Sequence, residues 1–183
     1  MKPSHIFQLT PLLLIAANIV SCSSNVIIST PAATQQSSFT DPFAYCGAIG
    51  TIDAPDARYT GPKMPETVAK GLMKATGAPA DAPLDVFTNN SFWRCMGGKV
   101  YACTVGANIP CESKADTSKT PNEGTMNWCV SNPNSDFIPA VATGRETVYE
   151  WRCTNGAPQI VKQVLTPDAR GFISVFWYLI NPG

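Results

Sequence analysis

Residues 93–98, Trp-Arg-Cys-Met-Gly-Gly, determine the fold class, because a closely similar stretch, Trp-Arg-Cys-Thr-Asn-Gly, recurs at residues 151–156. Each stretch lies in a run of β-type residues and ends in a Gly-Gly or Asn-Gly pair. Such pairs favour a two-residue type I′ turn, whose two central residues have positive φ. The sequence therefore predicts two β-hairpins and an antiparallel sheet built from them.

The turns also set the register, because side chains alternate between the two faces of a strand. In the first hairpin Trp93 and Cys95 lie on one face and Arg94 on the other. The register places Val100 opposite Cys95. Cys95 and Cys103 are then three pair positions apart, on the order of 10 Å, which is too far for a disulfide.

In the second hairpin Trp151 and Cys153 share one face, and Arg152 lies on the opposite face. Pro158 falls opposite Cys153 at a non-hydrogen-bonded position, where the pairing does not need the missing N–H. Its strand is therefore expected at the edge of a sheet.

Two short helices complete the expected α+β domain. Pro65 suits a first helical position, and Glu66 complements the helix dipole in the first turn. Gly77 can end the element, so we predict an amphipathic helix over residues 65–76.

Further along the chain, Thr120-Pro121-Asn122-Glu123 has the pattern of a capping box and predicts a helix that runs through Cys129. Residues 81–87 carry signals for one more helical turn. Residues 172–180, Phe-Ile-Ser-Val-Phe-Trp-Tyr-Leu-Ile, are apolar on both faces. This is typical of a central strand buried on both sides, although an apolar run is also compatible with a helix.

Six cysteines follow residue 40 and predict disulfides in an exported chain. They are Cys46, Cys95, Cys103, Cys111, Cys129 and Cys153. No two are closer than eight positions, whereas a zinc or iron–sulfur site needs a tighter pair such as Cys-x-x-Cys. We therefore expect three disulfides and neither metal nor other cofactor, and the fifteen pairings that six cysteines allow stay open.

Residues 1–21 have the character of a signal peptide. Lys2 precedes an apolar stretch at residues 6–20, which polar residues interrupt and which is too short for a membrane span. The stretch ends in Ile19-Val20-Ser21-Cys22, which resembles the lipobox of bacterial lipoproteins. This resemblance implies lipidation of Cys22. The alternative is an ordinary signal peptide with Cys22 incidental, and a protein that is secreted or soluble in the periplasm.

Residues 22–40 are expected to form a lipid anchor and a flexible tether, because residues 23–40 are rich in Ser, Thr, Ala and Gln and carry no charge. Acyl chains on Cys22 would bury methylenes worth about 0.8 kcal/mol each in a membrane. The segment resembles those of Gram-negative lipoproteins. With Ser23 after the cysteine, this resemblance implies that the protein is anchored in the outer membrane and faces the periplasm. Residues 41–183 are then a single disulfide-rich α+β domain.

The charged residues exclude several function classes. Lys+Arg and Asp+Glu are equal at 13 each, and charged residues make up only 14% of the chain, so no electrostatic footprint for nucleic acid is present. The single histidine, His5, lies in the expected signal peptide. The mature chain therefore has no histidine for a Ser-His-Asp system or a His-ligated metal.

Carboxylates are the remaining conventional acids and bases, and their spacing is not that of a catalytic pair. Glu146 and Glu150 on a strand would be roughly 13 Å apart, beyond the roughly 5–9.5 Å of glycosidase pairs. Asp53 and Asp56 are better interpreted as turn residues. Serine–lysine pairs have no diagnostic spacing here. The sequence thus leans away from an enzyme.

Five side chains are candidates for contact with a partner: Trp93, Arg94, Trp151, Arg152 and Lys114. Neighbouring Trp and Arg residues could form an aromatic and cationic recognition surface. The alternative is that the tryptophans fill the core beside the disulfides and the arginines stay in water. Lys114 lies in a polar loop, which could bind a partner or merely be solvated.

The last third of the chain resembles the membrane-bound lysozyme inhibitors of Gram-negative bacteria. The resemblance rests on Tyr149 ahead of Cys153, on Gly156 after it, and on Phe176-Trp177. Those inhibitors are small, disulfide-containing, β-rich lipoproteins that plug the active site of their target. The predicted helix at residues 65–76 does not belong to that pattern, and no inhibitory residue is carried over.

These observations predict a lipid-anchored, non-enzymatic binding module of the inhibitor, immunity or assembly type. Its expected partners are the membrane, through the anchor, and an envelope protein or a cell-wall glycan. One alternative is a small carboxylate-dependent hydrolase of envelope polymers, and another is a purely structural lipoprotein.

Overall fold

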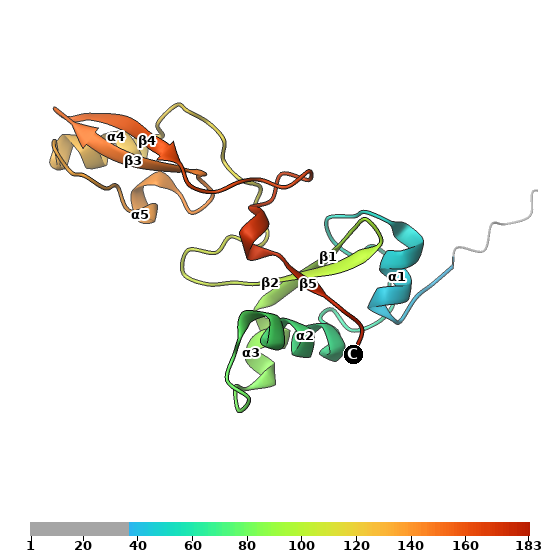
Figure 1. Ribbon diagram of the computed structural model, residues 1–183. Helices are drawn as coiled ribbons and strands as arrows, with labels where there is room; N and C mark the ends of the chain where they lie inside the picture. Colours follow the sequence, from blue (N-terminus) through green and yellow to red (C-terminus); the bar gives the residue numbers. More distant parts are fainter. Residues whose placement is uncertain (1–36) are drawn as a thin grey trace, which may run out of the picture. The chain divides into compact units, whose positions relative to one another are not determined.

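The computed structural model describes residues 37–183 (Figure 1). The expected signal peptide, residues 1–21, and the lipidation site Cys22 lie outside the described residues. The folded part begins before the predicted boundary at residue 41, because Phe39 pairs with the backbone of Arg58 and Thr60 through hydrogen bonds of 2.8 Å each. The last residues of the predicted tether therefore belong to the folded structure.

Within residues 37–183 the strands form two separate antiparallel sheets, and together with the helices they confirm the predicted α+β class. One sheet has the strand order β1-β2-β5 and contains β1 (Ser91–Met96), β2 (Lys99–Thr104) and β5 (Tyr178–Ile180). The other consists of β3 (Tyr149–Thr154) and β4 (Ala157–Gln163). The two predicted hairpins therefore lie in different sheets.

Both hairpins have the predicted turns and register. Gly97 and Gly98 have φ of 57° and 77°, and Asn155 and Gly156 have φ of 51° and 81°. Val100 lies opposite Cys95, and Pro158 lies opposite Cys153, as predicted. The local turn chemistry thus determines both pairings.

Three helices accompany the three-stranded sheet: α1 (Pro42–Ile49), α2 (Glu66–Thr76) and α3 (Leu84–Asn89) (Figure 1). The predicted helix at residues 65–76 is α2, which ends at Gly77 in a left-handed conformation with φ of 68°. Gly71 lets α2 pack closely on β5, because a Cβ at this position would lie 2.5 Å from the side chain of Ile180. Helix α1 was not predicted, although Asp41 caps it by accepting the N–H of Ala44 at 2.7 Å.

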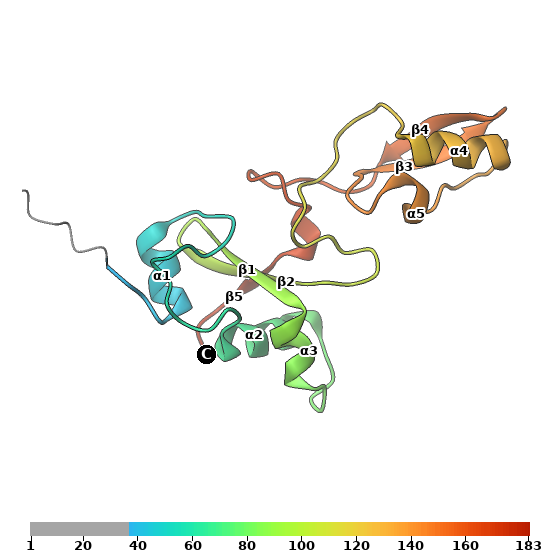
Figure 2. The same ribbon diagram turned by 180° about the vertical axis from the view of Figure 1, so that it is seen from behind.

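The second sheet is accompanied by α4 (Glu123–Ser131) and α5 (Ala140–Thr143), and Figure 2 shows α4 in front of the β3–β4 hairpin. The sequence correctly predicts a helix through Cys129, but the predicted capping residue is wrong. Asn122, and not Thr120, caps α4 by accepting the N–H of Thr125 at 2.8 Å. The amide side chain of Asn122 thus performs the role that the capping-box pattern assigned to a threonine two positions earlier.

The prediction of one long central strand over residues 172–180 is wrong. The run contains a short 3₁₀ helix, η1 (Ser174–Phe176), and only the three residues of β5 pair with β2, at the edge of the sheet. Phe172 and Trp177 are buried, whereas Val175 is 60% exposed. The apolar run therefore bends, so that Ile173 and Ile180 are buried along with the two aromatic rings, while Val175 and Leu179 stay exposed.

The prediction of disulfide bonds is confirmed for all six cysteines. The pairs are Cys46–Cys95, Cys103–Cys111 and Cys129–Cys153. Within residues 37–183, most of the buried apolar residues fall into three clusters, and each cluster contains one of the three disulfides. Each bridge therefore reinforces a small core of its own, a common solution where single cores are limited in size.

Candidate functional site

A pocket of about 690 Å³ lies beside the start of β1. Its walls come from the loop 53–63, from residues 91–93 and 111–114, and from Phe172 and Trp177. We call this site the aromatic pocket. Its volume is in the range of sites that bind small ligands, and such pockets combine apolar walls with a few positioned polar groups.

Aromatic rings make up much of this wall. Tyr59 and Trp93 meet edge to face with their ring centroids 4.8 Å apart, and Phe172 and Trp177 do so at 5.3 Å. The indole N–H of Trp93 donates to the backbone oxygen of Lys63 at 2.8 Å, which fixes the ring to the loop. These contacts give the pocket a rigid apolar floor.

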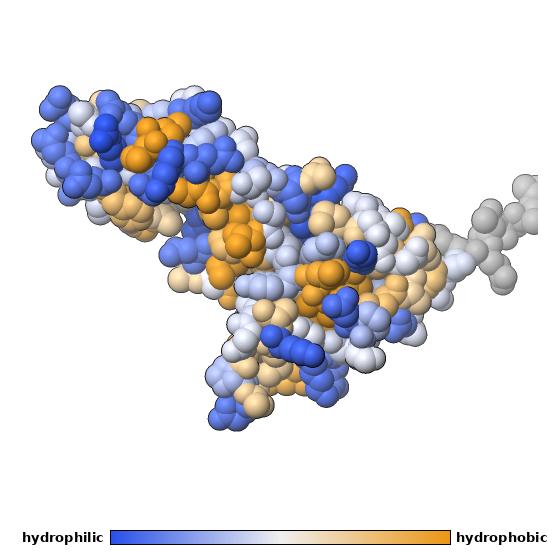
Figure 3. Space-filling view, viewed as in Figure 1, coloured by the Kyte–Doolittle hydropathy of each residue, from blue (hydrophilic) through white to orange (hydrophobic). Residues whose placement is uncertain are grey.

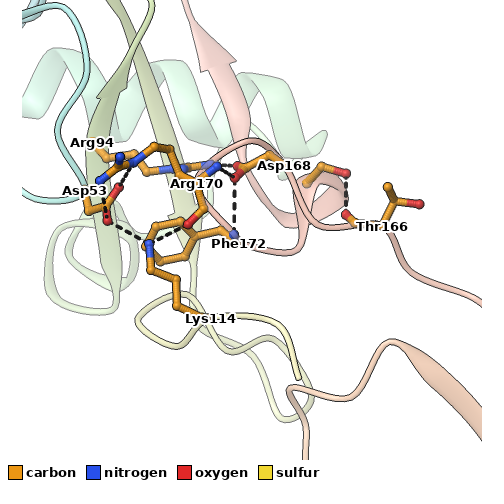
Figure 4. A network of polar contacts seen from close by, with 8 residues as sticks. Asp53, Arg94, Lys114, Thr166, Asp168, Arg170 and Phe172 are labelled. Atoms are coloured by element: carbon orange, nitrogen blue, oxygen red, sulfur yellow. Dashed lines mark hydrogen bonds and ion pairs between the residues drawn. The ribbon is translucent and has the colours of Figure 1, made fainter. Parts of the chain in front are cut away.

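Arg94 supports this floor from inside the protein. Its guanidinium carbon lies 4.4 Å from the ring centre of Phe172 and 4.3 Å from that of Trp177, and the side chain is only 1% exposed. The guanidinium forms an ion pair with Asp168 (Figure 4). Burial by itself raises the pKa of Asp168, but hydrogen bonds from Arg94 and from the backbone of Arg170 outweigh it and lower the pKa. Asp168 therefore stays ionised beside Arg94.

Asp53 joins three chain segments at the rim of the pocket (Figure 4). Arg170 donates to both of its carboxylate oxygens, at 2.8 and 3.1 Å, and Lys114 donates at 2.7 Å. The ammonium nitrogen of Lys114 also lies 3.5 Å from the ring centre of Phe172. The hydrogen bond from Arg170, aided by Lys114, lowers the pKa of Asp53 to about 2.

Asp56, a second carboxylate of the pocket, is held in the same manner by one arginine. The Nε of Arg58 lies 3.0 Å from each oxygen of Asp56. These hydrogen bonds lower the pKa of Asp56 to about 2. Asp53 and Asp56 are therefore both ionised near neutral pH, and neither can donate a proton as a general acid.

The structure does not gather the five predicted partner-binding side chains on one surface. Trp93, Trp151 and Arg94 are only 3%, 5% and 1% exposed, so all three side chains are largely buried, at different places in the fold. The alternative that the tryptophans fill the core agrees with their burial, whereas the expectation that both arginines stay in water is wrong for Arg94. Its charge is tolerated inside because Asp168 and two aromatic rings surround it.

Arg152 and Lys114 are exposed. Arg152 lies on β3 and contacts the side-chain oxygen of Gln159 at 3.4 Å. On the face shown in Figure 3, hydrophilic side chains surround a small apolar patch over this hairpin. Of the five predicted residues, Trp93 and Lys114 line the aromatic pocket, and Lys114 carries a charge there.

Sequence reasoning missed most of the pocket. The sequence pattern indicates turn residues at Asp53 and Asp56 and assigns no role to Arg170. Arg170 lies 117 positions from Asp53, so no short motif reveals that pair, whereas Arg58 is only two positions from Asp56.

Within residues 37–183, no helix combines the length and the apolar character that a membrane crossing requires. The same residues contain no group of three or more His, Cys, Asp or Glu side chains arranged to hold a metal ion. No protein-family model, curated protein or solved structure matches the chain.

Proposed function

We propose that the chain is a lipid-anchored lipoprotein of the bacterial outer membrane, and that its disulfide-stabilised part is a non-enzymatic binding module. The lipobox-like residues Ile19 to Cys22 support the anchor. The aromatic pocket supports the binding role, and it is the site at which the partner binds.

One observation carries the preference for binding over hydrolysis. The carboxylates of Asp53 and Asp56, which line the pocket, are each engaged by basic side chains that hold their pKa near 2. A glycosidase of the conventional kind needs one carboxylic acid that keeps its proton near neutral pH. Two carboxylates that stay ionised are suited to accept hydrogen bonds from a ligand.

The hydrolase remains the second candidate because Glu112 also lines the pocket and takes part in no ion pair within the described part of the chain. A hydrolase would have to use Glu112 as its acid. Turnover of an envelope polymer that disappears in Glu112→Gln would support this candidate against the binding module.

The anchor is tested by labelling cells with an alkyne-bearing fatty acid. The full chain should take up the label and sediment with the outer membrane. Cys22→Ser should lose both properties, and the neighbouring variant Ser24→Ala should keep them. An unlabelled wild-type chain, or equal labelling of Cys22→Ser, would refute the anchor.

The binding role is tested by capture from detergent-solubilised envelopes with the lipidated protein. Phe92→Ala removes a partly exposed ring from the pocket, and Phe137→Ala removes a ring that is 60% exposed outside it. Wild type and Phe137→Ala should retain the same envelope component, and Phe92→Ala should lose it. If Phe92→Ala captures the component as well as the wild type does, binding takes place elsewhere and the pocket is not the binding site.

A further inference from the structure

The charges around the aromatic pocket nearly cancel. Asp53 and Asp56 are each paired with arginine, and Lys114 binds Asp53 as well. Lys63 and Glu112 supply one further charge of each sign to the lining. A balanced pocket of this kind has no excess charge to select a phosphate or a polycation, and it suits an uncharged ligand.

Two hydroxyl groups of the pocket residues lack a hydrogen-bond partner within residues 37–183. They are the hydroxyls of Ser91 and Tyr59, and the Ser91 side chain belongs to a residue only 6% exposed. Buried hydroxyls are normally hydrogen-bonded. Burial, together with the nearby charge of Asp41, raises the pKa of Tyr59, so its hydroxyl keeps its proton and can donate as well as accept.

The aromatic and polar groups of the pocket are complementary to a sugar ring. A pyranose has an apolar face of C–H groups, which packs on rings such as Phe92 and Tyr59. Its hydroxyl groups both donate and accept, so they can satisfy Ser91 and can donate to the fixed oxygens of Asp56. A purely apolar ligand would leave these polar groups unpaired.

We propose that the aromatic pocket binds a neutral glycan, with a sugar ring packed on Phe92 and hydroxyl groups bonded to Ser91 and Asp56. This inference rests on the proposed binding function and names the class of ligand. It does not require any bond to be made or broken.

The test uses the full lipidated chain in a detergent without a sugar headgroup, on an array of neutral and acidic glycans that includes N-acetylglucosamine oligomers. Hits are measured by the fluorescence of the tryptophans, because Trp93 and Trp177 line the pocket. We expect saturable binding of a neutral oligosaccharide, weakened at least about tenfold by Phe92→Ala and several-fold by Ser91→Ala. Phe137→Ala should bind as the wild type does.

The outcomes separate this inference from the proposed function. Preferential binding of acidic glycans, or neutral binding that Phe92→Ala leaves unchanged, would overturn the neutral-glycan site. The neutral-glycan site would also be overturned if no glycan binds while an envelope component is still captured in a Phe92-dependent manner. In that case the proposed binding function stands. If no glycan binds and no capture depends on Phe92, both proposals fail.

Discussion

Arg170 binds both carboxylate oxygens of Asp53 at 2.8 and 3.1 Å, although the two residues are 117 positions apart in the sequence. Lys114, from a third segment, binds the same carboxylate at 2.7 Å and the backbone oxygen of Arg170 at 2.7 Å. These contacts connect the loops that form one rim of the aromatic pocket. The position of that rim therefore depends on Asp53.

Asp53→Asn should destabilise the protein modestly, because it removes the charge that Arg170 and Lys114 bind. All three side chains are partly exposed, so we expect a loss of about 1 kcal/mol or less in the free energy of unfolding at neutral pH. Urea unfolding measures this loss. Asp81→Asn, at an exposed acid without an ion pair in the described structure, is the control, and an equal loss in both variants would count against the network.

The contribution of Asp53 should also depend on pH. Its pKa is about 2 in the folded chain, compared with roughly 3.9 for an unperturbed aspartate. Because the folded pKa is the lower one, the stabilisation is present above about pH 4 and is lost as the pH falls through about 2. The difference in unfolding free energy between wild type and Asp53→Asn should therefore shrink over this range. A difference that stays constant throughout the range would contradict the assignment.

The two equivalent arginines of the repeated motif should respond very differently to substitution. Arg94→Ala leaves the buried charge of Asp168 without its partner and removes the side chain that packs against both Phe172 and Trp177, so we expect a loss of about 3–5 kcal/mol. Arg152→Ala, at the matching exposed position of the second hairpin, should change the stability by less than about 0.5 kcal/mol. Urea unfolding of both variants tests this contrast, and similar losses would refute the structural role of Arg94.

The disulfides should differ in how much they contribute to the free energy of unfolding, because they close chain segments of different length. Cys46 and Cys95 are 49 positions apart, and Cys103 and Cys111 are 8 apart. The chain-entropy relation gives about 4 kcal/mol for the longer loop and about 2.5 kcal/mol for the shorter one. Guanidinium unfolding of the two double-alanine variants should show the larger loss for the Cys46–Cys95 pair. The reverse order would show that local packing outweighs loop closure here.

Local features of the fold could be predicted from the sequence because their causes lie within a few residues. Gly-Gly and Asn-Gly determine both hairpin turns, and Gly77 determines the end of α2. The apolar run at residues 172–180 has no such local determinant, since either a strand or a bend buries part of it. Its course depends on Phe172 and Trp177 packing around Arg94, which the sequence pattern does not contain.

The candidate site was harder to predict because its residues come together only through tertiary contacts. Arg94 is buried since Asp168, 74 positions later, compensates its charge. The motif alone gives Arg94 and Arg152 the same expected environment, and only the partner segments distinguish them. The aspartates of the loop 53–56 have a turn-like sequence, and their role at the pocket depends on Arg170, Lys114 and Arg58.

The most direct test of binding without catalysis measures, in one reaction, both the capture of an envelope component and its breakdown. Lipidated protein is incubated with an isolated envelope preparation, and the retained envelope component and the soluble fragments released over time are both quantified, with Phe92→Ala and Glu112→Gln as variants. We predict retention of a component that Phe92→Ala abolishes, with no release of fragments above a protein-free control. Release of fragments by the wild type that Glu112→Gln abolishes would contradict the proposed function and identify a hydrolase.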